Sequence, residues 1–329
     1  MKKLNLAVLG ATGAVGREML AVLEERNFPV NNLLLLSSER SAGKEIIWRG
    51  EKFVTADAAK SDFSNIDVML GAVSADLSRL YSPKAAEKGA VVIDNSSAYR
   101  MDEGVPLVVP EINPGDISRH KGIIANPNCT TIITLTAVSP LNAYSPIKRM
   151  TASSYQAISG AGAEAIAELE GQMADYAANR PLSARVFDYP ILHNIIPHIG
   201  DMTENGYTKE ELKLANESRK ILHSPDVRIS CTCVRVPVIR SHSVSVSLEF
   251  ESGISVDKAR EILSGAPGVV LSDDGVYPMP INVSGQDMVF VGRIRKDLSS
   301  ESGLCLWCCG DQLRKGAATN AVQIAELIY

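Results

Sequence analysis

The chain has 329 residues, of which 45% are hydrophobic and 22% are charged, and its formal net charge is -5 at pH 7. This composition is typical of a globular protein that is long enough for two domains. The negative charge excludes a general electrostatic attraction to nucleic acid or to an anionic membrane surface. No apolar run approaches the roughly 18 residues of a membrane span. Asn5 interrupts the short N-terminal run, so we expect a cytoplasmic protein without a signal peptide.

The chain contains six cysteines, and five of them lie in two strand-like segments. Cys231 and Cys233 alternate in ISCTCVRV, whereas Cys305, Cys308 and Cys309 lie in GLCLWCCG. The CxxC spacing of Cys305 and Cys308 leaves a zinc site open as an alternative, but both segments are apolar and lack tight turns. We therefore expect free thiols that pack as small hydrophobic groups, and no metal.

The first part of the chain alternates short apolar runs with helix-like segments. Strands are expected at residues 4–10, 32–38, 67–73, 90–95 and 122–128, and helices at 16–27 and 78–89. The run of four leucines in the second strand is typical of a strand that is buried on both faces. This alternation predicts a doubly wound parallel sheet of the kind that binds dinucleotides.

The pattern changes after residue 128 toward longer alternating strands. We expect strands at 149–159, 227–238 and 241–252, with helices at 162–178 and 208–222 between them. Such alternation is typical of a mostly antiparallel sheet with one covered face. The segment 311–329 reads as a helix that returns to the first domain. The sequence thus predicts an α/β protein with a dinucleotide-binding domain (1–127 with 313–329) and an α+β catalytic and dimerisation domain (128–312).

The glycine-rich segment GATGAVG, residues 10–16, lies between the first strand and the first helix. Glycines allow a tight turn and a close approach of the backbone to a pyrophosphate, which the helix N-terminus stabilises. The spacing is GxxGxxG instead of the usual GxGxxG, so the motif alone is weak. Its position between a strand and a helix nevertheless predicts a dinucleotide site.

The end of the second strand indicates which dinucleotide binds. Ser38, Arg40 and Ser41 provide a guanidinium and hydroxyl groups, which suit the 2′-phosphate of NADP. Glu39 instead indicates NAD, because an acidic side chain at this place usually holds the 2′-hydroxyl of NAD. NADP is therefore favoured, and NAD stays open.

Cys129 follows a strand and begins a helix-like run in the segment ANPNCTT. The positive end of a helix dipole favours a thiolate, which makes this cysteine the best nucleophile candidate of the six.

The segment NPNCTT is similar to the active-site segment of aspartate-semialdehyde dehydrogenases, in which Ser-Thr is common where this chain has Thr-Thr. Further segments of the same family occur in order along nearly the whole chain: GATGAVG, SSERSAGK, DNSSAYRM, SYQAISGAG, YTKEELK, RVPVIRSHS and GDQLRKGAATNAVQIAE. The resemblance implies reversible reductive dephosphorylation of L-4-aspartyl phosphate to L-aspartate 4-semialdehyde with NADP. It also implies a homodimer and a place in lysine, threonine, methionine and isoleucine biosynthesis.

The resemblance assigns roles to individual residues. Cys129 is the covalent nucleophile, His242 the proton acceptor, and Gln156 the amide that orients the reacting centre. Arg235 is implied to bind the substrate carboxylate. The rest of the implied substrate and phosphate site consists of Arg100, Lys213, Asn128 and Glu210. The implied cofactor-binding residues are Gly10, Thr12, Gly13, Ala14, Val15, Ser38, Arg40, Ser41, Ser159, Gly160, Gln312 and Asn320.

Two alternatives of different kinds remain open. An N-acetyl-glutamyl-phosphate reductase shares the glycine loop, the cysteine and the phosphorylating chemistry, although Arg235, Gln156 and the SGAG and RVPV segments favour the aspartyl substrate. A catalytically silent relative would keep the fold and bind a dinucleotide. Such a protein usually lacks a reactive residue, whereas Cys129, Gln156, Arg235 and His242 are all present.

Overall fold

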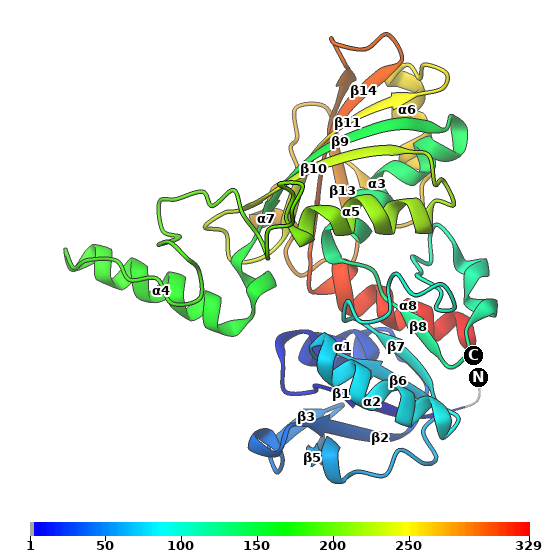
Figure 1. The fold of residues 1–329 in the computed structure, drawn as a ribbon, viewed down its shortest axis with the longest axis vertical. Helices are drawn as coiled ribbons and strands as arrows, with labels where there is room; N and C mark the ends of the chain where they lie inside the picture. Colours follow the sequence, from blue (N-terminus) through cyan, green and yellow to red (C-terminus); the bar gives the residue numbers. More distant parts are fainter. Residues whose placement is uncertain (1–2) are drawn as a thin grey trace. The chain divides into compact units, whose positions relative to one another are not determined.

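The computed structural model describes residues 3–329, which form two compact units (Figure 1). Unit 1 comprises Met1–Cys129 and Gly316–Tyr329, and unit 2 comprises Thr130–Lys315. Each unit contains its own sheet, so the predicted α/β class with two different sheets is confirmed. Among the described residues, no helix combines the length and apolar character that crossing a membrane requires.

Unit 1 is built on a parallel sheet. Within residues 3–329 it has six strands in the order β5-β2-β1-β6-β7-β8, and all neighbouring pairs are parallel. Its strands are β1 (Leu4–Leu9), β2 (Val30–Ser37), β5 (Ala56–Asp57), β6 (Val68–Gly71), β7 (Val91–Asp94) and β8 (Ile123–Ala125). Its helices are α1 (Ala14–Glu25), α2 (Ala75–Glu87) and α8 (Thr319–Ile328), with short helical turns η1 (Glu39–Ser41), η2 (Ala58–Lys60) and η3 (Pro114–Arg119). The strand order reverses between β1 and β6, where such sheets bind ligands.

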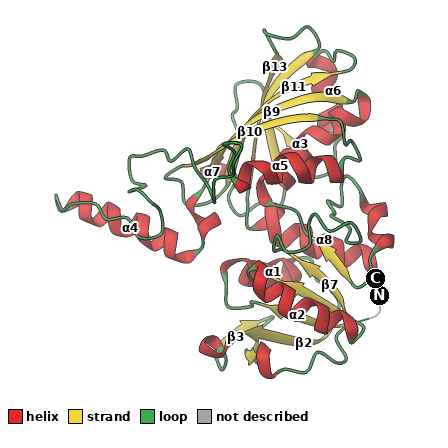
Figure 2. Ribbon diagram, in the orientation of Figure 1, coloured by secondary structure: helices red, strands yellow, loops and turns green. Residues whose placement is uncertain are grey.

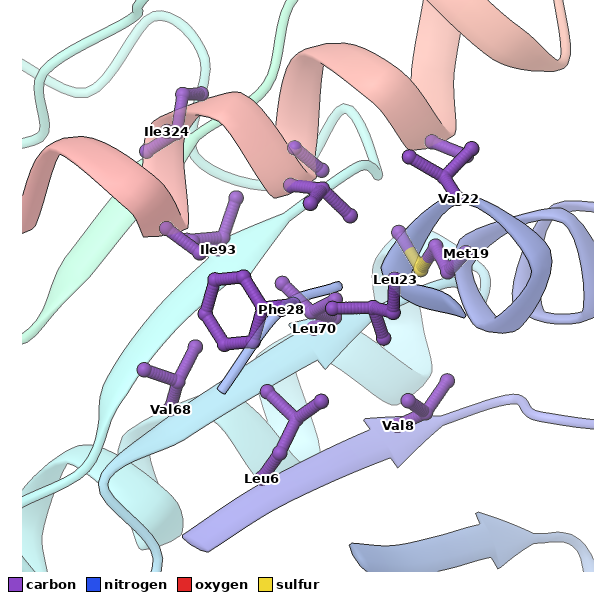
Figure 3. Close-up of a cluster of buried hydrophobic side chains, with 14 of the residues drawn as sticks. Leu6, Val8, Met19, Val22, Leu23, Phe28, Val68, Leu70, Ile93 and Ile324 are labelled. Atoms are coloured by element: carbon purple, nitrogen blue, oxygen red, sulfur yellow. The ribbon is translucent and has the colours of Figure 1, made fainter. Parts of the chain in front are cut away.

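Alternate side chains of β1 enter two different hydrophobic layers. Leu6 and Val8 pack with side chains of α1 and α8, including Met19 and Ile324 (Figure 3). Ala7 and Leu9 pack in a second layer together with side chains of α2. Helices thus cover both faces of the sheet, and each fully buried aliphatic side chain contributes about 1.5 to 3 kcal/mol.

The C-terminal segment belongs to unit 1. The single helix predicted over 311–329 is a π-helical turn, η5 (Arg314–Ala318), followed by α8. Ala321, Val322 and Ile324 of α8 lie in the same core cluster as β1 and α1. Helix α8 therefore packs in the core of unit 1.

A hairpin of β3 (Glu45–Trp48) and β4 (Glu51–Val54) was not predicted. Its turn consists of Arg49 and Gly50, which both have positive φ, as a two-residue hairpin turn of the favoured hand requires. The sequence lacks the usual Asn-Gly signal at this turn. The indole nitrogen of Trp48 donates to the carbonyl oxygen of Leu20 at 2.8 Å, which attaches the hairpin to α1.

Unit 2 is built on a mixed sheet. Across the described part of the chain its order is β10-β9-β11-β14-β13-β12. The three inner pairs are antiparallel and the two outer pairs are parallel. The strands are β9 (Ile147–Gln156), β10 (Arg228–Arg235), β11 (His242–Phe250), β12 (Val269–Leu271), β13 (Val289–Lys296) and β14 (Gly303–Gly310). The mostly antiparallel sheet is confirmed, whereas β12 and β13 were not predicted.

The helices of unit 2 differ in how they meet this sheet (Figure 2). They are α3 (Cys129–Tyr144), α4 (Ala163–Ala177), α5 (Lys209–Ile221), α6 (Val256–Ser264) and α7 (Pro280–Val283), with the turn η4 (Ile158–Ala161) before α4. Helix α4 lies away from the sheet (Figure 1) and packs instead on its own small cluster with Ile191 and Ile196. Helix α5 begins at a capping box, in which Thr208 and Glu211 each bond the backbone N–H of the other.

The cysteines of the two strand-like segments are free thiols. The Sγ atoms of Cys231 and Cys233 lie 3.7 Å apart on one face of β10, as the alternation predicted. Cys305 and Cys308 are three residues apart on β14, so their side chains point to opposite faces of the sheet. Their CxxC spacing therefore does not bring the two sulfurs together.

Candidate functional site

The glycine loop of unit 1 connects β1 to α1 at the point where the strand order reverses. Gly10 has a φ of +87°, and a Cβ there would lie 2.3 Å from the carbonyl oxygen of Ala72. A Cβ on Gly16 would lie 2.2 Å from the carbonyl oxygen of Gly10. Neither position can hold a side chain without moving backbone, so the glycines allow this tight connection. The loop ends at Gly13, the N-cap of α1, where the helix dipole favours an anion.

A cavity of about 420 Å³ opens beside this loop. Its lining includes Gly10, Thr12, Gly13 and Ser38 from the predicted cofactor site. Further lining residues are Leu9, Ser37, Glu39, Asp57, Ala58, Ala59, Lys60, Ala72, Val73, Leu77 and Tyr81. The cavity combines a glycine cradle, hydroxyl groups and apolar walls, which fits a nucleotide.

Four predicted cofactor residues of unit 1 lie next to this cavity without lining it. Ala14 and Val15 begin α1, and Arg40 and Ser41 lie on η1. Arg40 is exposed, whereas Ser41 is buried, and its carbonyl oxygen accepts a hydrogen bond from the Thr55 hydroxyl at 2.7 Å.

The segment before Cys129 is held in unit 1 by buried polar contacts. The side-chain amide of Asn126 donates to Asn95 Oδ1 and accepts from Asn320 Nδ2, both at 2.7 Å. The Nε of Arg100 donates to the carbonyl oxygen of Asn126 at 2.9 Å. These contacts fix the backbone just before Asn128 and Cys129, so Arg100 and Asn320 position the loop that leads to Cys129.

Cys129 itself is half-buried and is the first residue of α3. Asn128, just before it, is buried. The predicted strand, loop and helix around the cysteine are thus all present, and the sulfur is at the helix end that favours a thiolate.

Gln156, Arg235 and His242 lie together in unit 2 because of strand register. Gln156 ends β9 and is paired with Arg235, the last residue of the neighbouring parallel strand β10. His242 begins β11, whose next residue, Ser243, is paired with Tyr155 of β9. All three side chains are buried, although two of them are polar and one is charged. Burying polar and charged side chains costs folding free energy. Clusters of this kind are therefore typical of functional sites.

The imidazole of His242 is fully buried and has a defined tautomer. Its Nδ1 accepts a hydrogen bond from the backbone N–H of Ala157 at 3.1 Å. The proton of the neutral ring is therefore on Nε2. This Nε2 has no hydrogen-bond partner within the described residues. Burial, and secondly the positive charge of Arg235, lower the pKa of His242 to about 3, which keeps the ring neutral.

Arg235 is fixed beside His242 and reaches a second cavity. Its Nη1 donates to the carbonyl oxygen of Ala157 at 2.6 Å. The residue also lines a cavity of about 310 Å³ in unit 2. A Cβ on Gly160 would lie 3.2 Å from Arg235 Nη1 and 3.5 Å from His242 Nε2. A Cβ at this position would therefore crowd the guanidinium, so glycine allows Arg235 and His242 to pack closely against the turn η4.

Glu210 and Lys213 share one face of α5, as their spacing predicted. Their side chains form an ion pair at 2.9 Å, and Glu210 also accepts from Gln156 Nε2 at 3.4 Å. Glu210 is buried, so the pair is not an ordinary surface contact. It connects Lys213 to the residues at the ends of β9 and β10.

Ser159 and Gln312 are also in unit 2 and are joined directly. The side-chain amide of Gln312 donates to the Ser159 hydroxyl and accepts from the backbone N–H of Ser241. Gln312 thereby braces the residue before His242 and the turn η4, which contains Gly160. Arg100 belongs to unit 1 and Lys213 to unit 2, so the predicted phosphate-binding pair is divided between the units.

Among the contributors that sequence reasoning missed are Lys60 and the backbone N–H of Ala157. Lys60 lines the cavity of unit 1, but it follows a strand of only two residues, which no periodicity can reveal. The backbone N–H of Ala157 sets the His242 tautomer from 85 positions away in the sequence, and a backbone group gives no sequence signal.

Both units match known family descriptions. Residues 5–120 match "Semialdehyde dehydrogenase, NAD binding domain", and residues 138–315 match "Semialdehyde dehydrogenase, dimerisation domain". The fold, the glycine cavity and these matches define an oxidoreductase of the semialdehyde dehydrogenase class, with a nicotinamide dinucleotide-binding domain.

The relatives narrow this class. An aspartate-semialdehyde dehydrogenase of Aquifex aeolicus is 51% identical, with 98% of this chain and 97% of the relative covered. The crystal structure of aspartate semialdehyde dehydrogenase II from Vibrio cholerae is 43% identical with a TM-score of 0.98, covering 99% of this chain and 98% of that one. An enzyme from Candida albicans, solved with NADP, is 26% identical with a TM-score of 0.78, covering 99% and 98%. The chain belongs to the aspartate-semialdehyde dehydrogenase family, and the resemblance found in the sequence is confirmed.

Proposed function

We propose that this protein interconverts L-aspartate 4-semialdehyde and L-4-aspartyl phosphate in an NADP- and phosphate-dependent reaction. The observation that carries the proposal is that buried Gln156 and Arg235, at the ends of β9 and β10, lie next to buried His242 at the start of β11. A second observation is that Cys129 stands at the N-terminus of α3 and forms no disulfide. The aspartate-semialdehyde dehydrogenase of Aquifex aeolicus, which is 51% identical, supports the same reaction.

In the proposed reaction Cys129 carries the acyl group. Its sulfur attacks the aldehyde carbon and forms a thiohemiacetal. NADP held by the glycine loop would take up the hydride of this carbon, and with release of the hydroxyl proton to water the adduct on Cys129 would become a thioester. Phosphate then attacks the thioester carbon, the carbon–sulfur bond breaks, and the Cys129 thiolate leaves with formation of the acyl phosphate. The reverse sequence reduces the acyl phosphate.

His242 donates a hydrogen bond to the oxygen of the tetrahedral adduct. In its observed tautomer, Nε2 donates a hydrogen bond, which stabilises negative charge on that oxygen. The proton-acceptor role predicted from the sequence requires a proton on Nδ1 instead, so the contact with Ala157 would have to break first. Gln156 provides a neutral amide beside the same site, held by Ser154 at 3.2 Å and by Glu210.

Fixed cations recognise the two anions of this reaction. Arg235 binds the substrate carboxylate, because its guanidinium is immobilised by Ala157 and suits bidentate pairing. Lys213, held by Glu210, and Arg100 bind phosphate. In the cofactor site, Gly10, Thr12 and Gly13 would hold the pyrophosphate, and Ser38, Arg40 and Ser41 would hold the 2′-phosphate. Ser159, Gly160 and Gln312 would bind the nicotinamide.

We include a homodimer and a cytoplasmic location in this proposal. The family description of residues 138–315 names a dimerisation domain. Unit 2 also exposes large apolar side chains on and after α4, including Tyr176, Tyr189 and Ile195. Such an exposed set indicates a protein contact. Six free thiols fit a reducing compartment.

The direct test is NADP reduction with L-aspartate 4-semialdehyde, with and without phosphate. We expect turnover that depends on phosphate, and a loss of at least about 100-fold in Cys129→Ser. Cys305→Ser is the matched control, because Cys305 is also half-buried and should keep activity. Turnover only with the N-acetylated glutamate analogue would favour the reductase alternative. Absence of turnover in the folded protein would favour a silent relative.

A further inference from the structure

The cavity beside the glycine loop has a charged edge that the assigned cofactor residues do not account for. Lys60, the last residue of η2, donates to Glu39 at 2.9 Å and lies 3.5 Å from Asp57. All three side chains line the cavity. Within residues 3–329, Lys60 is the one lysine or arginine among the lining residues, since Arg40 lies on η1 outside the lining.

The strand order explains why these groups meet. β5 pairs with the end of β2, with Asp57 opposite Ser37, so η2 follows directly at the edge of the cavity. Asp57 caps η2 by accepting from the backbone N–H of Ala59 at 3.0 Å, and Lys60, at the end of the same turn, contacts Glu39. The Lys60 side chain is 72% exposed, and exposed ion pairs contribute little to folding. The arrangement therefore has little value for stability and can respond to a ligand.

The carboxylates at this edge favour NAD, whereas the lysine favours NADP. A carboxylate at the end of the second strand holds the 2′-hydroxyl of NAD and repels a 2′-phosphate. Glu39 and Asp57 together would repel the phosphate strongly. Lys60 neutralises Glu39, and its ammonium group has three donors, of which these carboxylates engage two.

We infer that Lys60 is a determinant of NADP selectivity: it masks Glu39 and offers its remaining donor to the 2′-phosphate. This inference rests on the proposed function, in which NADP is the cofactor. It adds a residue on η2 to the residues of η1 that the sequence indicated. The phosphate is thus held between cations on two separate turns.

The test uses two probes that differ only in the 2′-phosphate, namely 2′,5′-ADP and 5′-AMP, titrated calorimetrically into the full-length protein. We expect Lys60→Met to weaken 2′,5′-ADP about five- to tenfold and to change 5′-AMP less than about twofold. Glu39→Gln should strengthen 2′,5′-ADP, because a repelling charge is removed. Lys52→Met is the matched control, since Lys52 forms a comparable exposed pair with Glu45 outside the cavity.

The results distinguish a failure of the role of Lys60 from a failure of the NADP preference. Equal weakening of both probes in Lys60→Met would mean that Lys60 only shapes the cavity, and it would overturn the inference. An unchanged preference for 2′,5′-ADP would overturn it as well. If the unaltered protein bound both probes equally, the NADP preference in the proposed function would fail, and the inference with it.

Discussion

The fully buried His242 should make unit 2 less stable in mild acid. An unfolded histidine has a pKa near 6.5, whereas burial and the charge of Arg235 lower the folded pKa to about 3, despite the opposing charge of Glu210. Between these values the unfolded chain binds a proton that the folded chain does not. His242 therefore does not change the free energy of unfolding above pH 6.5, and it lowers this free energy as the pH falls from 6.5 toward 3. The loss at pH 5 is about 2 kcal/mol, with a maximum near 5 kcal/mol below pH 3.

The comparison of the protein with His242→Gln isolates this contribution, because all other titrating groups are shared. The chain has two tryptophans, Trp48 in unit 1 and Trp307 in unit 2. In a Trp48→Phe background, fluorescence thus reports urea unfolding of the unit that contains His242. We expect the free energy of unfolding to fall by about 2 kcal/mol more between pH 7 and pH 5 with His242 than with Gln. Equal pH dependence of the two proteins would refute a buried, neutral imidazole.

Two further predictions concern the glycine loop and the dimer. Gly10→Ala should destabilise unit 1 by more than about 2 kcal/mol and abolish dinucleotide binding, because its Cβ would meet the Ala72 carbonyl oxygen at 2.3 Å. Gly43→Ala is the control in thermal unfolding and in binding, because Gly43 has a similar φ of +83° but no atom within contact distance of an added Cβ. If the two variants lost stability and binding equally, the steric argument would be contradicted. Tyr176→Asp should shift the proposed dimer toward monomer in analytical ultracentrifugation, because Tyr176 is 59% exposed on α4. An unchanged mass would exclude α4 from the contact.

Local patterns allowed most of the fold to be predicted. The short apolar run of β1 and the helix-like pattern of α1 predicted these elements, because their apolar side chains are buried in the structure. The missed elements lack such signals. β5 has two residues, and the β3–β4 turn uses Arg49-Gly50 where Asn-Gly is usual. In each case the neighbouring strand or helix, and not local propensity, stabilises the element.

The site was predictable where chemistry is carried by side chains in motifs. Gln156, Arg235 and His242 are brought together by strand register, although 86 residues separate the first from the last. The sequence could identify them through the family resemblance, but it could not give the protonation of His242. That depends on a backbone N–H at Ala157, which any residue except proline would provide.

The burial of His242 determines both its role in the proposed reaction and its effect on stability in acid. A histidine that exchanges protons freely near neutral pH would need a pKa close to 7, and partial solvation would provide it. Complete burial beside Arg235 instead lowers the pKa to about 3 and leaves Nε2–H as an uncharged donor without a partner among residues 3–329. A donor that is held in a site of low polarity, and that does not titrate, stabilises developing negative charge on an oxygen more strongly than one surrounded by water. The acid instability expected of unit 2 and the proposed support of the tetrahedral adduct thus follow from the same burial.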